Sequence, residues 1–436
     1  MVIPTPRAAA LVAAGAVVLA AWPGADWRTC VLVNGVLLVA VAVDAIRCIS
    51  PATIRVSREL PGSMRVGDTA EVAWSIDNPG HRPVLATVTD TLWPSFGATR
   101  RSVTARLAPA TRTRATAQLR PTRRGRFPLD TIAVRVAGPL GLVGRQASRV
   151  VAGSIKVMPA YPSQDAVRRR WRIPRVADTG LRTIRLTGGG TEFDQLRDFR
   201  EGDEFRRIDW ASTMRLQRPI VKQFQIERNQ TVVVLLDNGR VMAGTVAGAP
   251  RVEHAMDAAL AVAEATLHLG DRVGMVCFDR EVRSIVPATS GRRHLGAVSE
   301  AMYLLEPDFG ESAYLAAFSA AAARFRRRSL FVVLTDLSES TVEQTIRPAL
   351  ALLLRRHVVV VGCVRDPVIG EWARPTDIEW ASDAYRQAAA IGNLDARDRA
   401  AARLRSTGAI VVDAEPGQLA LCLVDTYLEL KAAGRL

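Results

Sequence analysis

The strongest constraint on the fold is a regular alternation of apolar runs and helical stretches that begins near residue 230. Short continuous apolar runs are typical of strands buried on both faces, and helices between them predict a parallel sheet covered on both sides. The predicted strands are 231–236, 272–278, 329–335, 358–364 and 409–412, and the predicted helices are 252–269, 294–305, 313–325, 342–354, 382–405 and a last one from residue 418. Ligands of such sheets bind at the carboxyl ends of the strands. Asp237 and Asp336 therefore attract attention, because each follows a hydrophobic strand.

Residues 52–160 have a different pattern, in which short strands with alternating apolar residues are separated by turn residues. Val72, Trp74 and Ile76 share one face of such a strand, and several later segments repeat the alternation. This spacing predicts a small β-sandwich domain, immunoglobulin-like in type. Domains of this kind serve as spacers or binding modules.

Two apolar runs precede the sandwich, at residues 8–22 and 30–43, and each is bounded by charge. A spanning helix needs about 20 apolar residues, so the first run would start near Ile3 and the second would extend to Ile49. The second span would then include Asp44 and Arg47 near its end. Residues 23–26 give a turn signal between the runs. We therefore expect two transmembrane helices, forming a hairpin, in residues 1–50.

The charges that flank this hairpin predict its orientation. Arg7 precedes the hairpin, whereas Arg47, Arg55 and Arg58 follow it. Positive flanks face the cytoplasm, so we expect a multi-pass protein of the cell membrane whose large domains are cytoplasmic. The alternative is a cleaved signal peptide ending near residues 18–20, after which the second span would still anchor the chain.

Composition and motif content argue against several classes of function. The net charge of +15 invites a nucleic-acid interpretation, but the arginines are dispersed and aromatic residues make up only 6% of the chain. The five cysteines are far apart and form no zinc-binding pair. The sequence contains no phosphate-binding loop, dinucleotide fingerprint or serine-hydrolase motif. We therefore expect neither a nucleic-acid partner nor an enzyme, and any ATP-driven step would belong to a partner.

An unusual polar stretch, residues 189–210, separates the two patterns. It carries a glycine, Glu-Phe, Leu-Arg, Gly-Asp and Arg-x-Ile-Asp-Trp in this order, and it closely resembles the signature of domain-of-unknown-function family 58. Segments 123–125 and 138–142 also resemble that family. The residues of the signature and its continuation are Glu192, Phe193, Arg197, Gly202, Asp203, Arg206, Asp209, Trp210, Glu227 and Arg228.

The resemblance implies a von Willebrand A-like fold, with a Rossmann-type parallel sheet, for residues 230–436. Residues 161–229 would be a signature segment that packs on that domain. The resemblance also implies a partnership with a MoxR-type AAA+ ATPase in assembling or remodelling other proteins. No enzymatic activity is established for the family.

The charged residues of the signature have two interpretations. Its acids Glu192, Asp194, Asp203, Glu204 and Asp209 offer the oxygens that a hard cation prefers. Its arginines Arg197, Arg200, Arg206 and Arg207 alternate with these acids, which favours a charge-paired belt held against the next domain. We favour the belt, with Asp203 as a helix cap and with Phe193 and Trp210 as apolar anchors.

The resemblance also implies a metal-ion-dependent adhesion site, in which Asp-x-Ser-x-Ser follows the first strand and binds Mg²⁺. Here the motif begins with Asp237, but Gly239 and Val241 stand where the two serines belong. Asp336 matches the distal aspartate and Ser312 replaces the threonine. The site is thus predicted to be degenerate, and Mg²⁺ is its candidate ligand. In the alternative interpretation, Asp237 and Asp336 cap nearby helices.

These observations favour a membrane-anchored adaptor that binds protein partners, of unknown oligomeric state. Two alternatives stay open at this point. One is a Mg²⁺-dependent hydrolase that uses the acidic signature, and the other is an adhesion or receptor protein of the cell envelope.

Overall fold

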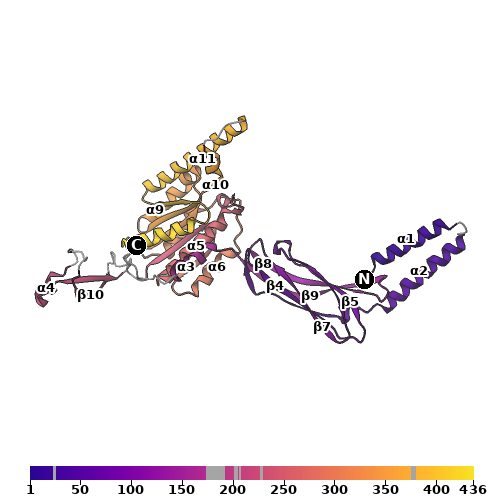
Figure 1. Ribbon diagram of the computed structural model, residues 1–436. Helices are drawn as coiled ribbons and strands as arrows, with labels where there is room; N and C mark the ends of the chain where they lie inside the picture. Colours follow the sequence, from indigo (N-terminus) through magenta and orange to yellow (C-terminus); the bar gives the residue numbers. More distant parts are fainter. Residues whose placement is uncertain (23–25, 173–191, 201–204, 206–207, 226–228, 375–379) are drawn as a thin grey trace. The chain divides into compact units, whose positions relative to one another are not determined.

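The computed structural model describes residues 1–22, 26–172, 192–200, 205, 208–225, 229–374 and 380–436. They form two compact units, Met1–Met158 and Pro159–Leu436 (Figure 1). Strands and two N-terminal helices build the first unit, and the second is a mixed α/β unit.

Two sheets share one hydrophobic core in the first unit. One sheet has the strand order β1-β9-β8-β5-β6, with β3 paired to β9, and the other has the order β2-β4-β7. Val72, Trp74 and Ile76 are buried between them, because alternate residues of a strand point to one face. The strands are β1 (Val2–Pro4), β2 (Arg55–Glu59), β3 (Ser63–Arg65), β4 (Ala70–Asn78), β5 (Val84–Asp90), β6 (Ser102–Leu107), β7 (Thr111–Leu119), β8 (Gly125–Ala137) and β9 (Val143–Met158).

The N-terminal helices α1 (Pro6–Ala21) and α2 (Trp27–Arg47) run side by side (Figure 1). A Cβ placed on Gly15 of α1 would meet Val33 and Leu37 of α2 at 3.7 Å, an ordinary van der Waals distance, so the two helices pack against each other at this position. Among the described helices, the one that starts at Trp27 is long and apolar enough to cross a membrane, whereas α1 is apolar but shorter. Most of the predicted turn, residues 23–25, lies outside the described residues.

A buried carboxylate joins α2 to the strand-rich sheet. Asp44, in the last turn of α2, is fully buried and accepts hydrogen bonds from the backbone amides of Leu140, Leu142 and Val143 at 2.7, 2.8 and 2.8 Å. A Cβ on Gly138 would lie 2.5 Å from the carboxylate, so only glycine leaves room for it there. The charged residue that interrupts the second apolar run is therefore a structural link to the β8–β9 loop.

The α/β unit is built on one six-stranded sheet with the order β16-β15-β12-β17-β18-β19. The strands are β12 (Thr231–Asp237), β15 (Arg272–Phe278), β16 (Val282–Thr289), β17 (Leu330–Thr335), β18 (Val358–Val364) and β19 (Ile410–Ala414). The predicted strands form the parallel part of this sheet. The expectation of a purely parallel sheet is wrong at one edge, where β16 pairs antiparallel with β15. A short turn joins these two strands, and a connection of that length allows only antiparallel pairing.

Helices cover both faces of this sheet. Val232, Val234 and Leu236 pack into a cluster with α3, α5, α6 and α12, and the alternate residues Val233 and Leu235 pack into a cluster with α7, α9 and α11. The helices are α3 (Pro162–Arg172), α5 (Arg251–His268), α6 (His294–Tyr303), α7 (Tyr314–Arg324), α8 (Glu339–Thr341), α9 (Arg347–Leu354), α10 (Pro367–Trp372), α11 (Ala381–Ser406) and α12 (Leu419–Ala432).

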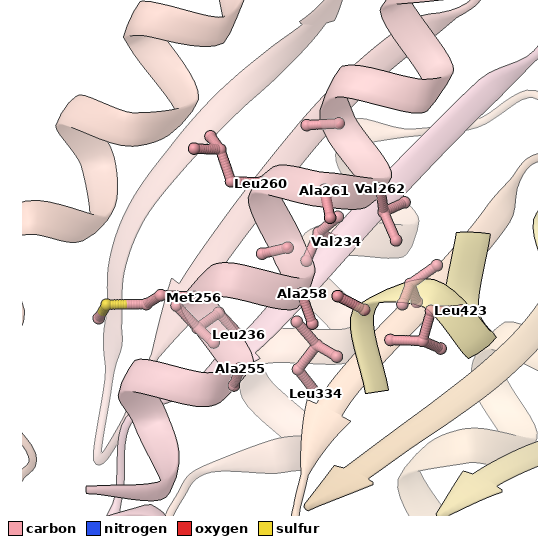
Figure 2. Packing of buried hydrophobic residues seen from close by; sticks show 14 of the residues in the cluster. Val234, Leu236, Ala255, Met256, Ala258, Leu260, Ala261, Val262, Leu334 and Leu423 are labelled. Atoms are coloured by element: carbon pink, nitrogen blue, oxygen red, sulfur yellow. The ribbon is translucent and has the colours of Figure 1, made fainter. Parts of the chain in front are cut away.

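Small residues bring the central helix close to the sheet. Figure 2 shows Ala255, Ala258 and Ala261 of α5 beside Val234 and Leu334, among the side chains that fill this part of the core. Leu423 of α12 reaches the same cluster. Close packing of this kind makes the sheet rigid, so that side chains at the ends of its strands have defined positions.

Candidate functional site

The carboxyl end of β12 places Asp237 in a closed hydrogen-bonding network. Its side chain is fully buried, and Oδ1 accepts hydrogen bonds from the Ser312 hydroxyl at 2.5 Å and from the Gly239 amide at 2.9 Å. Oδ2 accepts from the hydroxyls of Tyr314 at 2.5 Å and Thr335 at 2.7 Å. An ionised carboxylate offers about four acceptor positions, so donors of the protein itself occupy the whole group.

Burial and hydrogen bonding act in opposite directions on Asp237. Burial raises the pKa of its carboxyl group, while the hydrogen bonds from Ser312, Tyr314 and Thr335 favour the charged form and lower it. Burial is the larger effect, so the pKa is raised overall. The same burial, together with the neighbouring carboxylate, raises the pKa of the Tyr314 hydroxyl well above its ordinary value. Tyr314 therefore stays a hydrogen-bond donor to Asp237.

The space beside Gly239 explains why this position carries no side chain. A Cβ on Gly239 would come within 2.0 Å of the Ser312 hydroxyl oxygen and 3.3 Å of Asp237 Oδ1. Ser312 thus fills the place that a side chain at position 239 would need. The two predicted residues Asp237 and Ser312 are brought together, but the contact between them is a direct hydrogen bond.

Asp336 has different partners, which are all cationic. Its Oδ1 accepts a hydrogen bond from Arg397 at 2.7 Å, and its Oδ2 lies 3.4 Å from a guanidinium nitrogen of Arg251. Arg397 is itself held by Asp413 at 2.8 and 2.9 Å and donates to the Val364 carbonyl at 3.0 Å. Asp336 is therefore the centre of a buried ion-pair network that connects α5, α11 and β19.

The residues of this site do not fit a divalent cation. Asp237 has no acceptor position to spare, Asp336 is neutralised by two arginines, and Gly239 and Val241 supply no hydroxyl. In the described part of the chain, no group of three or more acidic, histidine or cysteine side chains is placed to hold a metal ion. The helix-cap interpretation is wrong as well, because the N-caps of the neighbouring α7 and α8 are Ala313 and Ser338.

The signature segment folds as a strand pair with a short helix between its strands. β10 (Glu192–Asp198) pairs antiparallel with β11 (Ile220–Gln225), so that Phe193 lies opposite Phe224 and Arg197 opposite Val221. Asp209 caps α4 (Trp210–Leu216) by accepting hydrogen bonds from the amides of Ala211 and Ser212 at 3.1 and 3.3 Å. The structure thus gives Asp209 a local backbone role.

The apolar side chains of α4 are exposed. Trp210 and Met214, one helical turn apart, are 66% and 79% exposed, and Leu216 is 51% exposed. The expectation that Trp210 is a buried anchor is therefore wrong in this structure. Of the other signature residues, Gly202, Asp203, Arg206, Glu227 and Arg228 lie outside the described residues, and the side chains of Glu192, Phe193 and Arg197 are not described.

Sequence reasoning missed the residues that complete the Asp237 and Asp336 networks. Tyr314 stands two residues after Ser312 and Thr335 directly precedes Asp336, so both could be suspected from their neighbours. Arg251 and Arg397 gave no such signal, because each is one of many arginines on a predicted helix. Only the folded sheet brings them to Asp336.

The buried thiols show no sign of nucleophilic activation. Cys277 and Cys363 are completely buried at strand ends, and burial raises the pKa of Cys277 to about 12. The pKa of Cys363 is also raised well above its ordinary value. Reactive cysteines need a lowered pKa and access to solvent, so both side chains serve packing.

Comparisons with known proteins place this region in context. The family model described as "Protein of unknown function DUF58" matches residues 195–372. An uncharacterized protein of Mycobacterium tuberculosis, Rv1480, is 27% identical over 184 residues, which cover 42% of this chain and 57% of the relative. The chain thus spans little more than half the length of that curated relative.

Two solved structures are similar at low scores. BatB from Bacteroides thetaiotaomicron, a conserved hypothetical protein, has a TM-score of 0.31 and 15% identity, covering 47% of this chain and 99% of that one. The vWF domain of the type V pili tip protein Mfa5 from Porphyromonas gingivalis has a TM-score of 0.23 and 16% identity, covering 26% and 39%. The family resemblance predicted from the signature is confirmed by the family model, which matches residues 195–372.

Proposed function

We propose that this chain is a membrane-anchored adaptor that binds protein partners and works with a MoxR-type AAA+ ATPase in assembling or remodelling other proteins. The observation that carries the proposal is the exposed apolar face of α4, formed by Trp210 at the end of the signature stretch and by Met214 one turn later. Exposed tryptophan and methionine side chains that lie together are typical of protein-binding surfaces.

The surroundings of α4 support a docking role. Leu196 and Phe205 of the same segment are 41% and 76% exposed, so the segment has further exposed apolar side chains outside the helix. The hydrogen bonds that Asp209 makes to the start of α4 hold the backbone in place without covering Trp210. A large, rigid aromatic side chain of this kind loses little entropy when a partner covers it, which makes it a suitable anchor.

We assign the α/β unit to the von Willebrand A-like class and the strand-rich unit to the immunoglobulin-like class. We further propose that the adhesion site is degenerate and that partner binding does not require Mg²⁺. The networks around Asp237 and Asp336 support this, because protein donors occupy the acceptor positions of Asp237 and two arginines already balance the charge of Asp336. The ATPase partner is proposed from the family resemblance, and the absence of a nucleotide-binding motif in the sequence is consistent with ATP hydrolysis by a partner.

We also propose that α1 and α2 both cross the membrane as a hairpin and that the strands of the first unit and the whole α/β unit are cytoplasmic. The apolar surface of α2 and its contact with α1 at Gly15 support a paired insertion. Arginines near both outer ends of the pair support the orientation.

The test is recovery of partners with the full chain, solubilised from its native membranes in mild detergent. Wild type and the matched control Leu304→Ser, which alters a 59% exposed leucine outside the signature, are expected to recover a MoxR-type ATPase. Trp210→Ser with Met214→Ser is expected to lose most of it, and a chelator is expected to change nothing. Equal recovery by the double variant, or no ATPase with folded wild type, would contradict the proposal.

A further inference from the structure

The helix that connects to β19 after β18 is longer than the strand it packs against. α11 has 26 residues, which corresponds to about 39 Å of helix, whereas the adjacent strand β18 has seven residues and is roughly 23 Å long. The buried residues of α11 begin only at Ala390. Its first part therefore extends beyond the sheet, as Figure 1 shows for the end of α11 near α10.

This extension is paired with α10. Arg386 of α11 places its guanidinium group 5.7 Å from the ring centre of Trp372, at the end of α10. Gln387 donates a hydrogen bond to the Arg374 carbonyl at 2.8 Å. We call the described residues 366–374 and 380–395 the α10–α11 arm. These contacts give the arm a defined internal structure.

The arm exposes aromatic side chains that the fold does not need. Trp372, Trp380 and Tyr385 are 49%, 71% and 77% exposed. Val368 and Ile391 are 39% and 45% exposed and add aliphatic surface. Aromatic residues gathered on one projecting element are a recurrent feature of binding surfaces.

The charge of this segment is opposite to that of the whole molecule. The described residues of the arm include four acidic residues and two basic ones, in a chain whose net charge is +15. Among the described acids, Glu371 and Asp395 are exposed. A segment that combines exposed tryptophan rings with an excess of carboxylates suits a cationic ligand, because guanidinium and ammonium groups stack on such rings and pair with carboxylates.

We propose that the α10–α11 arm binds an arginine- and lysine-rich segment of a protein partner. The contact between Arg386 and Trp372 is an internal example of this recognition, with one guanidinium group already over one ring. Trp380 and Tyr385 offer further exposed rings, and Glu371 offers an exposed carboxylate next to Trp372 in the sequence. An anionic lipid surface is disfavoured, because it would repel the acidic residues. The proposal does not depend on the α4 surface.

The test uses the full chain in nanodiscs of phosphatidylcholine and a fluorescein-labelled oligo-arginine peptide as the probe. Fluorescence anisotropy at physiological ionic strength measures its affinity, with an oligo-glutamate peptide as the charge control. The arm variants are Trp380→Ala with Tyr385→Ala, and Glu371→Gln. Phe309→Ala is the matched control, because that ring is 80% exposed and lies outside the arm. Circular dichroism verifies that each variant is folded.

We expect oligo-arginine to bind wild type and Phe309→Ala with equal affinity. Its affinity for the aromatic double variant is expected to be lower by a factor of about ten or more. Glu371→Gln is expected to weaken binding to a smaller extent. The proposal is overturned if the double variant binds oligo-arginine like wild type, or if oligo-glutamate binds as tightly. It is also overturned if the arm variants lose binding only to phosphatidylserine vesicles, which would identify a lipid surface.

Discussion

Asp237 is the side chain that ties the carboxyl end of β12 to its surroundings. Its two oxygens accept four hydrogen bonds, and each donor is fixed by the fold. Asp237→Asn replaces one acceptor oxygen with a donor group, so two donors lose their acceptor inside the protein. We expect a loss of about 3 kcal/mol in the free energy of unfolding, since buried unsatisfied groups cost about 1–3 kcal/mol each. Urea unfolding of both proteins measures the difference.

Asp398→Asn is the control for this substitution, because Asp398 is exposed on α11. It is expected to change stability by less than about 0.5 kcal/mol. If Asp237→Asn is as stable as wild type, the four hydrogen bonds to Asp237 do not contribute to the stability of the fold. If millimolar Mg²⁺ stabilises wild type but not the variant, the carboxylate binds metal after all.

Single residues also mark the limit of what the sequence predicts about the site. The position of Asp237 at a strand end and its proximity to Ser312 follow from the order of strands and helices, because carboxyl ends of parallel strands share an edge. The pairing of Asp336 with Arg397 does not follow, since 61 residues separate them and no local pattern distinguishes Arg397 from other helical arginines. A sequence motif therefore indicated a metal ligand where the structure has an ion pair.

At the scale of elements, the link between α2 and the β8–β9 loop leads to a testable expectation. Asp44→Ala removes the acceptor of three backbone amides in the loop, those of Leu140, Leu142 and Val143. We expect the amides of Leu142 and Val143 to exchange with deuterium about tenfold faster or more, because they lose their only described acceptor at that position. Hydrogen–deuterium exchange of the full chain in detergent measures this rate.

Asp26→Ala gives the matched control, since Asp26 caps the other end of the same helix and accepts from Thr29 at 2.9 Å. It is expected to loosen the first turn of α2 and to leave the β8–β9 loop protected. Unchanged exchange of the loop in Asp44→Ala would show that the sheet alone orders it.

The elements themselves were predictable where their pattern is periodic. α5 was predicted at residues 252–269 and α11 at 382–405, each within one residue at both ends. β16 was missed, although its alternating burial is regular, because it belongs to an edge and lacks the continuous apolar run of the central strands. α3 was missed because its sequence is strongly polar, and among the side chains of this helix that the structure describes only Val167 joins the hydrophobic core.

At the scale of the whole molecule, the orientation across the membrane is the expectation that separates an adaptor from a surface receptor. Cys422 is a natural probe of it, because this thiol is exposed on α12, whereas Cys48, Cys277 and Cys363 are buried. In cells that carry the Cys30→Ser form, we expect a membrane-impermeant maleimide to label the protein only after permeabilisation. Adding Cys422→Ser should abolish that labelling. Labelling in intact cells would place the α/β unit outside and favour a receptor, because a charged reagent cannot cross the bilayer to reach a cytoplasmic thiol.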